Sequence, residues 1–131
     1  MPQFSAISAA RLASCDVRLA AVFNRVIGIA DCSILEGHRA QAAQDAALAA
    51  GRTQLGWPRS KHNRLPSLAV DAAPYPIDWA DRERFHLFAG LVLGVAAGIG
   101  VRLRWGGDWA GDFRPAANRF DDLPHFEIIE D

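Results

Sequence analysis

Cysteine is scarce in this sequence of 131 residues, which contains only Cys15 and Cys32. Two cysteines cannot build a multi-disulfide framework or a four-cysteine zinc site, and we expect both to be free, buried thiols. Long apolar runs are also lacking. The longest one, residues 87–101, has 15 residues and contains four glycines, whereas a membrane-spanning helix needs about 18–20 apolar residues. The sequence therefore predicts no membrane insertion.

An excess of charge of one sign is lacking as well. Lys and Arg total 14, Asp and Glu total 15, and the net charge is −1. This balance argues against binding to nucleic acid or to an anionic membrane surface. The N-terminal segment has no basic stretch followed by an apolar one, so we expect a protein without a signal peptide that is made and held in the cytoplasm.

What is present is the composition of a folded protein, with 50% hydrophobic and 22% charged residues. The length suits one domain, and no repeat or low-complexity linker divides it. We therefore predict a single domain over residues 1–131, and we expect a monomer.

Hydrophobic periodicity predicts the elements of this domain. Helices are predicted over residues 7–29, 40–50 and 81–98. The first helix has a break near 14–16, where Ser14 or Asp16 could cap a second helix. The last one is apolar all round in its second half, which predicts a buried helix. Strands are predicted at residues 32–35, 68–71, 101–105 and 125–129.

The connections between these elements indicate the fold class. The last two strands are joined by a loop, residues 106–121, that is too short for a helical crossover, so we expect them to pair antiparallel. Residues 52–67 are predicted to form a second long loop. The prediction is an α+β fold with a small, mostly antiparallel sheet, helices packed on one face and the functional site at the mouth of the sheet.

Two of the four histidines stand in contexts that suggest chemistry. His62 lies on a polar loop before a predicted strand that ends in Asp71, and His125 opens the last strand. Two histidines and one carboxylate form the ligand set of a catalytic zinc site. Asp122 lies three residues before His125, within reach of a water at the metal as general base. Each residue also has a structural alternative, since lone histidines often lie in cores and aspartates often form turns.

Four segments carry a resemblance. They are Ser60 to Asp71, with the pattern Ser-x-His…Ala-x-Asp; Asp122 to Glu127, with an acid three residues before a histidine; Glu36-Gly37-His38-Arg39; and Arg104-Trp105-Gly106-Gly107-Asp108-Trp109. The helix with Gln41 and Gln44 fits as well. Together they resemble the zinc peptidases of peptidoglycan: D-alanyl-D-alanine carboxypeptidases and dipeptidases, and L-alanyl-D-glutamate endopeptidases.

Two features differ from the usual pattern. Asp71 follows His62 by nine residues, two more than in the common signature, and the base position holds Asp122, where the dipeptidase branch has Glu. The aspartate and the segment around Trp105 are similar to the phage endolysin branch.

The resemblance implies a zinc ion (Zn2+) bound by His62, Asp71 and His125, with Asp122 as general base. It implies that Arg39 stabilises the oxyanion, with a structural ion pair as its alternative role. Contacts with substrate, or structural roles in turns and core, are implied for the remaining candidates: Ser60, Trp105, Asp108, Trp109 and Glu127.

The implied substrate is the peptidoglycan stem peptide, cut between L-alanine and D-glutamate by a phage or prophage endolysin once the membrane has been breached. Three alternatives stay open. They are a carboxypeptidase or dipeptidase of the same fold, a zinc-binding phage module without activity, and a small phosphodiesterase. Asp122 and Arg39 argue against the inactive module, because binding alone needs neither, and the lack of a basic groove argues against a nuclease.

Overall fold

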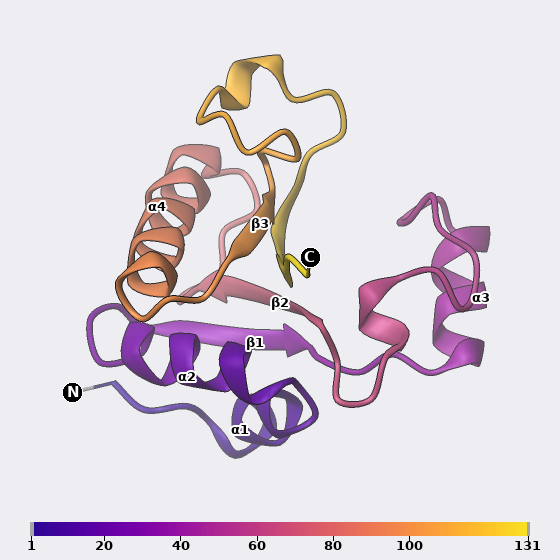
Figure 1. Cartoon of the computed structure of the whole chain (residues 1–131), viewed down its shortest axis with the longest axis horizontal. Coiled ribbons are helices and arrows are strands. Elements are labelled where there is room, and N and C mark those ends of the chain that lie inside the picture. The colour runs from indigo at the N-terminus through magenta and orange to yellow at the C-terminus, as the bar shows by residue number, and fades with distance from the viewer. Residues whose placement is uncertain (1, 131) are drawn as a thin grey trace.

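The computed structural model describes residues 2–130. Its helices are α1 (Ala6–Ala13), α2 (Val17–Val26), α3 (Gln41–Ala49) and α4 (Arg82–Gly98), with short 3-10 helices η1 (Lys61–Asn63) and η2 (Pro115–Ala117). Its strands are β1 (Cys32–Glu36), β2 (Ala69–Pro74), β3 (Leu103–Gly106) and β4 (Asp122–Ile128). The strands form one sheet in the order β1-β2-β4-β3, and all neighbours pair antiparallel. The α+β prediction is confirmed (Figure 1).

The predicted break in the first helical segment is also confirmed. Asp16 caps α2, because its carboxylate accepts a hydrogen bond from the backbone N–H of Arg18. Capping satisfies an N–H that the first helical turn leaves without a backbone partner. The chain can therefore stop α1 and restart as α2 in a new direction within three residues.

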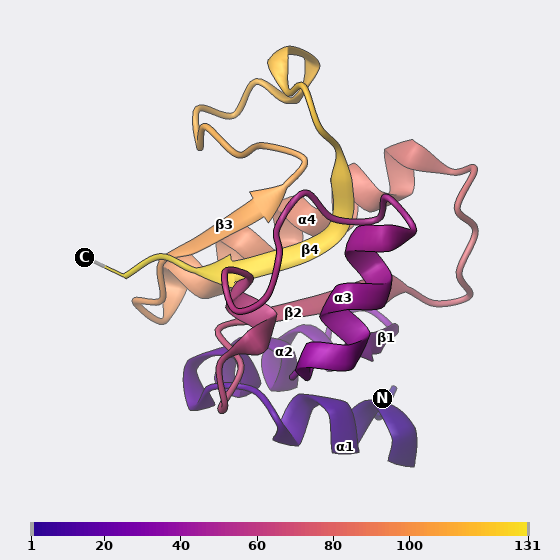
Figure 2. The ribbon, with the colours of Figure 1, turned by 90° about the vertical axis from the view of Figure 1, so that its right-hand side faces the viewer.

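One face of the sheet is covered by α2 and α4, while α3 lies on the opposite side (Figure 2). Side chains alternate along β4, and Phe126 points into the core, where it meets the rings of Phe23 from α2 and Phe88 from α4 edge-on, at 5.8 and 6.2 Å. Its neighbours His125 and Glu127 consequently point to the other face, toward α3. Both cysteines are buried and free, as predicted.

Two strand boundaries differ from the prediction. β2 runs on to Pro74, so Asp71 is its third residue and not its last, and β4 begins at Asp122, three residues before His125. Pairing extends β2, since Pro74 and Ala73 lie opposite residues of β1. Asp71 and His125 therefore stand within paired strands of the sheet and not at its end.

Helix α4 packs one stripe of its surface and exposes the other. Phe88, Val92 and Ala96 are buried, whereas Gly90 and Gly94 are exposed. The prediction of a helix buried all round is wrong, because its apolar outer surface consists largely of glycine. Within residues 2–130, no helix is both long enough and apolar enough to cross a bilayer.

Candidate metal centre

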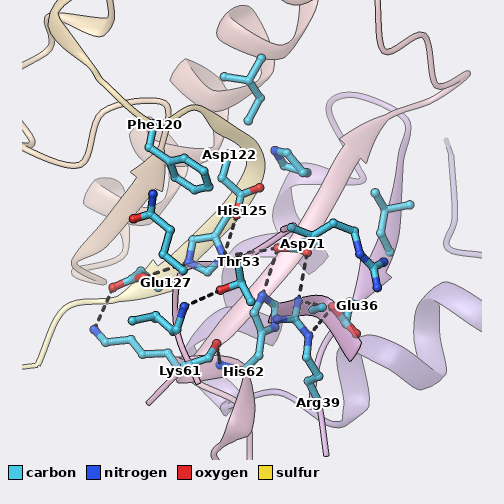
Figure 3. A pocket seen from close by; sticks show the side chains of 18 of the residues that line it. Glu36, Arg39, Thr53, Lys61, His62, Asp71, Phe120, Asp122, His125 and Glu127 are labelled. Carbon is cyan, nitrogen blue, oxygen red and sulfur yellow. Dashed lines mark hydrogen bonds and ion pairs between the residues drawn. The ribbon is translucent and has the colours of Figure 1, made fainter. Parts of the chain in front are cut away.

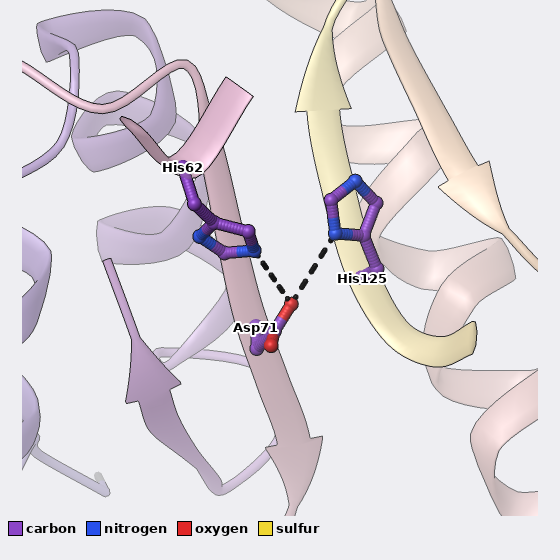
Figure 4. Close-up of side chains that lie close together, drawn as sticks. All are labelled: His62, Asp71 and His125. Carbon is purple, nitrogen blue, oxygen red and sulfur yellow. Dashed lines mark hydrogen bonds and ion pairs between the residues drawn. The ribbon is translucent and has the colours of Figure 1, made fainter. Parts of the chain in front are cut away.

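Three side chains from separate elements converge on the open face of the sheet (Figure 4). His62 comes from η1, and Asp71 and His125 are directly opposed partners on β2 and β4. Asp71 Oδ1 lies 3.1 Å from His62 Nε2 and 3.4 Å from His125 Nδ1. The three candidate ligand atoms all lie within 4.8 Å of one another, which is the spacing of groups that share one ion.

The outer nitrogen of each imidazole is held by a fixed acceptor. His62 Nδ1 lies 2.8 Å from the backbone oxygen of Gly37, and His125 Nε2 lies 2.8 Å from Glu127 Oε1. When these nitrogens carry the proton, the inner nitrogens present lone pairs toward Asp71. This arrangement is typical of histidines that bind a metal. Two imidazole nitrogens and a carboxylate oxygen fit zinc.

The charges of this cluster are strongly coupled. Burial raises the pKa of Asp71, but hydrogen bonds from His125 and His62 outweigh it and hold that pKa well below its ordinary value. Burial likewise lowers the pKa of His125, but hydrogen bonds to Asp71 and Glu127 outweigh it and raise the pKa to about 9. In the metal-free protein, the raised pKa favours a protonated His125 between the carboxylates of Asp71 and Glu127. A divalent cation bound there would replace this positive charge.

Ser60 positions His62 through the backbone. Its hydroxyl accepts a hydrogen bond from the His62 N–H, while Asn63 Oδ1 accepts one from the Ser60 N–H, which together form a capping box. Asn63 in turn donates to the backbone oxygen of Arg39 and to Gln44 Oε1. Ser60 is buried, and it fixes the position of His62 by accepting a hydrogen bond from its backbone N–H.

Arg39 stands at the edge of the cluster, with its Nη2 3.8 Å from Asp71 Oδ2. Its guanidinium donates to Glu36 Oε1 and, at 3.0 Å, to Gln44 Oε1. Gln44 is fully buried and also donates to the backbone oxygen of Leu55. The structural ion pair that was the alternative role for Arg39 is therefore present, with Glu36 as its partner. It holds the guanidinium beside Asp71.

Asp122 lies on the side of His125 that faces the cavity, with its Oδ2 3.9 Å from His125 Nδ1. Burial and the negative charge of Asp71 raise the pKa of Asp122. A carboxyl group of raised pKa beside a candidate metal site is suited to exchange protons with a reacting group.

Glu127 lies on the opposite side of His125, and two cations hold it. Lys61 Nζ is 3.2 Å and Arg104 Nη1 is 3.5 Å from Glu127 Oε2. Lys61 also donates to the backbone oxygen of Ile128. Because Glu127 Oε1 accepts from His125, these contacts fix the orientation of the imidazole.

The cluster lines a cavity of about 1270 Å³ between α3, the segment that follows it and the sheet (Figure 3). The cavity brings together most of the candidates that the sequence singled out: Arg39, Ser60, His62, Asp71, Trp109, Asp122, His125 and Glu127. Trp109 packs against the His125 ring, with their centroids 5.3 Å apart.

Trp105 and Asp108 do not line this cavity. Trp105 lies on the core side of β3, where its ring packs against His86 and its indole N–H donates to the backbone oxygen of Leu123. Asp108 accepts backbone hydrogen bonds from Asp112 and Phe113 and so closes its own loop. Both therefore make structural contacts outside this cavity, and substrate contact by Trp105 or Asp108 stays a prediction that the cavity lining does not support.

Some supporting contacts of the candidate metal site were not predicted from the sequence. The Gly37 carbonyl and Lys61 support the site through contacts over long sequence separations, which no local pattern reveals. Gln44 was singled out with its helix, but its contacts with Arg39 and the Leu55 oxygen were not predicted. Asn63 is different, since Ser60-x-x-Asn63 is a readable variant of the capping-box pattern.

The resemblance seen in the motifs is confirmed by comparison with known proteins. A family model described as phage L-alanyl-D-glutamate peptidase matches residues 1–129. The L-alanyl-D-glutamate peptidase of Escherichia phage T5 is 30% identical over 135 residues, covering 97% of this chain and 98% of that protein. The crystal structure of the Serratia marcescens L-Ala D-Glu endopeptidase ChiX matches with a TM-score of 0.76 and 26% identity, over 97% of this chain and 90% of that chain. The chain belongs to the phage L-alanyl-D-glutamate peptidase family.

Proposed function

We propose that this chain is a zinc-dependent peptidoglycan endopeptidase that hydrolyses the L-alanyl-D-glutamate bond of the stem peptide. The observation that carries the proposal is the convergence of His62, Asp71 and His125 on one wall of an open cavity. The names of the phage T5 and Serratia marcescens relatives support the choice of bond. The family supports a role in host lysis, after the membrane barrier has been opened.

His62, Asp71 and His125 would hold the zinc ion through Nε2, a carboxylate oxygen and Nδ1. A zinc ion bound there supplies an electrophile that acidifies water and polarises a peptide carbonyl. The Gly37 carbonyl and Glu127 keep the two imidazoles in the required tautomers, so the ligands need little rearrangement to bind.

Asp122 transfers the proton in this reaction, and Arg39 stabilises the negative charge that develops on the substrate. The Asp122 carboxylate takes a proton from the attacking water and returns it to the leaving amine. The Arg39 guanidinium, held in place by Glu36 and Gln44, faces the negative charge that develops on the scissile carbonyl oxygen. Trp109 forms part of the wall against which the peptide lies.

The test is digestion of intact peptidoglycan with the purified, zinc-loaded protein, followed by labelling of new amino termini and mass spectrometry. New D-glutamate termini are expected, together with one zinc per chain by elemental analysis. Release of free D-alanine alone, with the glycan still carrying its tripeptide, would establish a carboxypeptidase instead. Zinc binding without any cleavage would establish a binding module.

A further inference from the structure

The cavity holds two cations that the metal site does not use. We propose that Arg52 and Arg59 form a subsite for the free carboxylate of the substrate glutamate and thereby select acidic over amidated stem peptides. The inference rests on the proposed function and names the part of the substrate that the remaining charges of the cavity recognise.

The substrate brings an anion close to the scissile bond. Glutamate has two carboxyl groups, and a linear peptide uses only one of them, so the other stays free on the residue that follows the cut. With an ordinary pKa of about 4.3, it is ionised at neutral pH. The cavity wall is itself rich in carboxylates: Glu36, Asp71, Asp121, Asp122 and Glu127. An acidic substrate therefore needs a cation that these groups have not already neutralised.

Five cations line the cavity: Arg39, Arg52, Arg59, Lys61 and Arg82. Three are engaged in ion pairs with carboxylates of the same wall: Arg39 with Glu36, Lys61 with Glu127, and Arg82 with Asp121. Within residues 2–130, the side chains of Arg52 and Arg59 make no hydrogen bond or ion pair. These two guanidiniums are thus the ones with full capacity for an incoming anion.

Local backbone hydrogen bonds order the chain at both arginines. Gly51, with φ of +73°, ends α3 in the left-handed conformation, and the Arg52 N–H donates to the Ala47 oxygen at 2.9 Å. The Arg59 N–H donates to the Gly56 oxygen at 2.9 Å. Arg59 also directly precedes Ser60, the cap of the short helix that carries His62.

Their side chains, by contrast, are exposed and available to a ligand. A guanidinium binds a carboxylate through two parallel N–H bonds, which a lysine could not reproduce. Arg39 is a poorer candidate, because it is 11% exposed and would have to give up Glu36 to take a second carboxylate.

The test uses two synthetic stem peptides that differ only at the glutamate, which carries either the free carboxylate or its carboxamide. Both peptides end in a C-terminal amide, so no terminal carboxylate can substitute. The wild-type zinc enzyme is compared with Arg52→Gln, Arg59→Gln and the double variant. Arg25→Gln, at an exposed arginine of α2 outside the cavity, is the matched control for loss of one charge.

For the wild type, we expect kcat/KM on the acid peptide to exceed that on the amide by about 10- to 100-fold, the range for a charged hydrogen-bonded pair. The double variant should lose most of this preference by slowing on the acid peptide alone, with zinc content unchanged, and Arg25→Gln should keep it. Equal rates of the wild type on both peptides, or an equal loss on both in the double variant, would overturn the subsite while leaving the endopeptidase intact. Absence of cleavage of either peptide by the wild type would refute the proposed function and the subsite together.

Discussion

Gly37 offers the sharpest test of how packing of the first helix reaches the metal site. It lies directly after β1, buried against the end of α1. A Cβ added there would lie 2.4 Å from the backbone oxygen of Arg11 and 2.3 Å from Ser14 Oγ. Such contacts are far inside van der Waals distance, and a backbone oxygen cannot move aside unless the helix moves. Gly37→Ala must therefore displace either α1 or the chain at Gly37 itself.

The magnitude follows from both consequences of that displacement. Overpacking a tight site costs about 1–3 kcal/mol, which lowers Tm by about 4–11 °C in a domain of this size. The Gly37 oxygen also accepts the His62 Nδ1–H at 2.8 Å. Moving it frees the imidazole to rotate, and losing such an outer partner weakens metal binding by about 10- to 100-fold.

The assay combines thermal unfolding of the metal-free protein with zinc competition against a chromophoric chelator. Gly94→Ala is the matched control, because Gly94 is an exposed residue of α4 with no neighbouring atom within 4 Å of an added Cβ. It should raise stability by about 0.5–1 kcal/mol and leave zinc affinity unchanged. An unchanged Tm in Gly37→Ala would refute the packing argument. A lower Tm with wild-type zinc affinity would refute the link from Gly37 to His62.

Three further outcomes are expected. Asp122→Asn should lower kcat by at least about 100-fold with unchanged zinc content, because an amide cannot accept the proton; kinetics and elemental analysis check this, and near-normal turnover would move the base role elsewhere. Alanine in place of any one of the three proposed ligands should abolish stoichiometric zinc in dialysed protein, and retention of one zinc by the Asp71 variant would remove Asp71 from the ligand set. Asp16→Ala should destabilise the protein by about 0.5–2 kcal/mol at neutral pH through loss of the α2 cap. Since the hydrogen bond from Arg18 lowers the pKa of Asp16, this difference should persist above about pH 4 and vanish as the pH falls through the folded-state pKa; a difference that stays constant into acid would contradict the role of the charge.

Local signals predicted those features of the fold that local interactions decide. The break before α2 depends on Asp16 and the backbone next to it, so the position could be read from the sequence. The end of α3 depends on Gly51 alone, because glycine adopts positive φ without strain.

Strand lengths were decided by partners distant in the sequence. The run Asp71-Ala72-Ala73-Pro74 has no β-branched residue and ends in proline, so its local preference is weak. It is nevertheless a strand, because β1 pairs with it on one side and β4 pairs at Asp71 on the other. This pairing, which no local pattern reveals, moved the candidate site from the end of the sheet to its face.

Motif resemblance pointed to the proposed reactive residues more directly than to the residues that support them. It singled out the proposed ligands and Asp122, because metal binding and proton transfer accept only a few residue types at these positions. It also suggested Trp105, although the alternation Leu103-Arg104-Trp105 places that side chain on the face opposite Arg104, and Arg104 contacts Glu127 on the site face. The period-2 pattern was the more reliable guide to orientation at this position.

A continuous ring of side-chain contacts surrounds the candidate metal position and sets the spacing of the proposed ligands. Lys61 precedes His62 on η1 and reaches Glu127 on β4; Glu127 holds His125, and His125 and His62 meet at Asp71. The short helix is thereby tied to the sheet on both sides of the candidate metal position, by side chains that do not themselves bind the ion. Because each of the two histidines has a partner outside the proposed ligand set, the fold orients both imidazoles before a metal binds, and less of the binding free energy is lost to ordering the site.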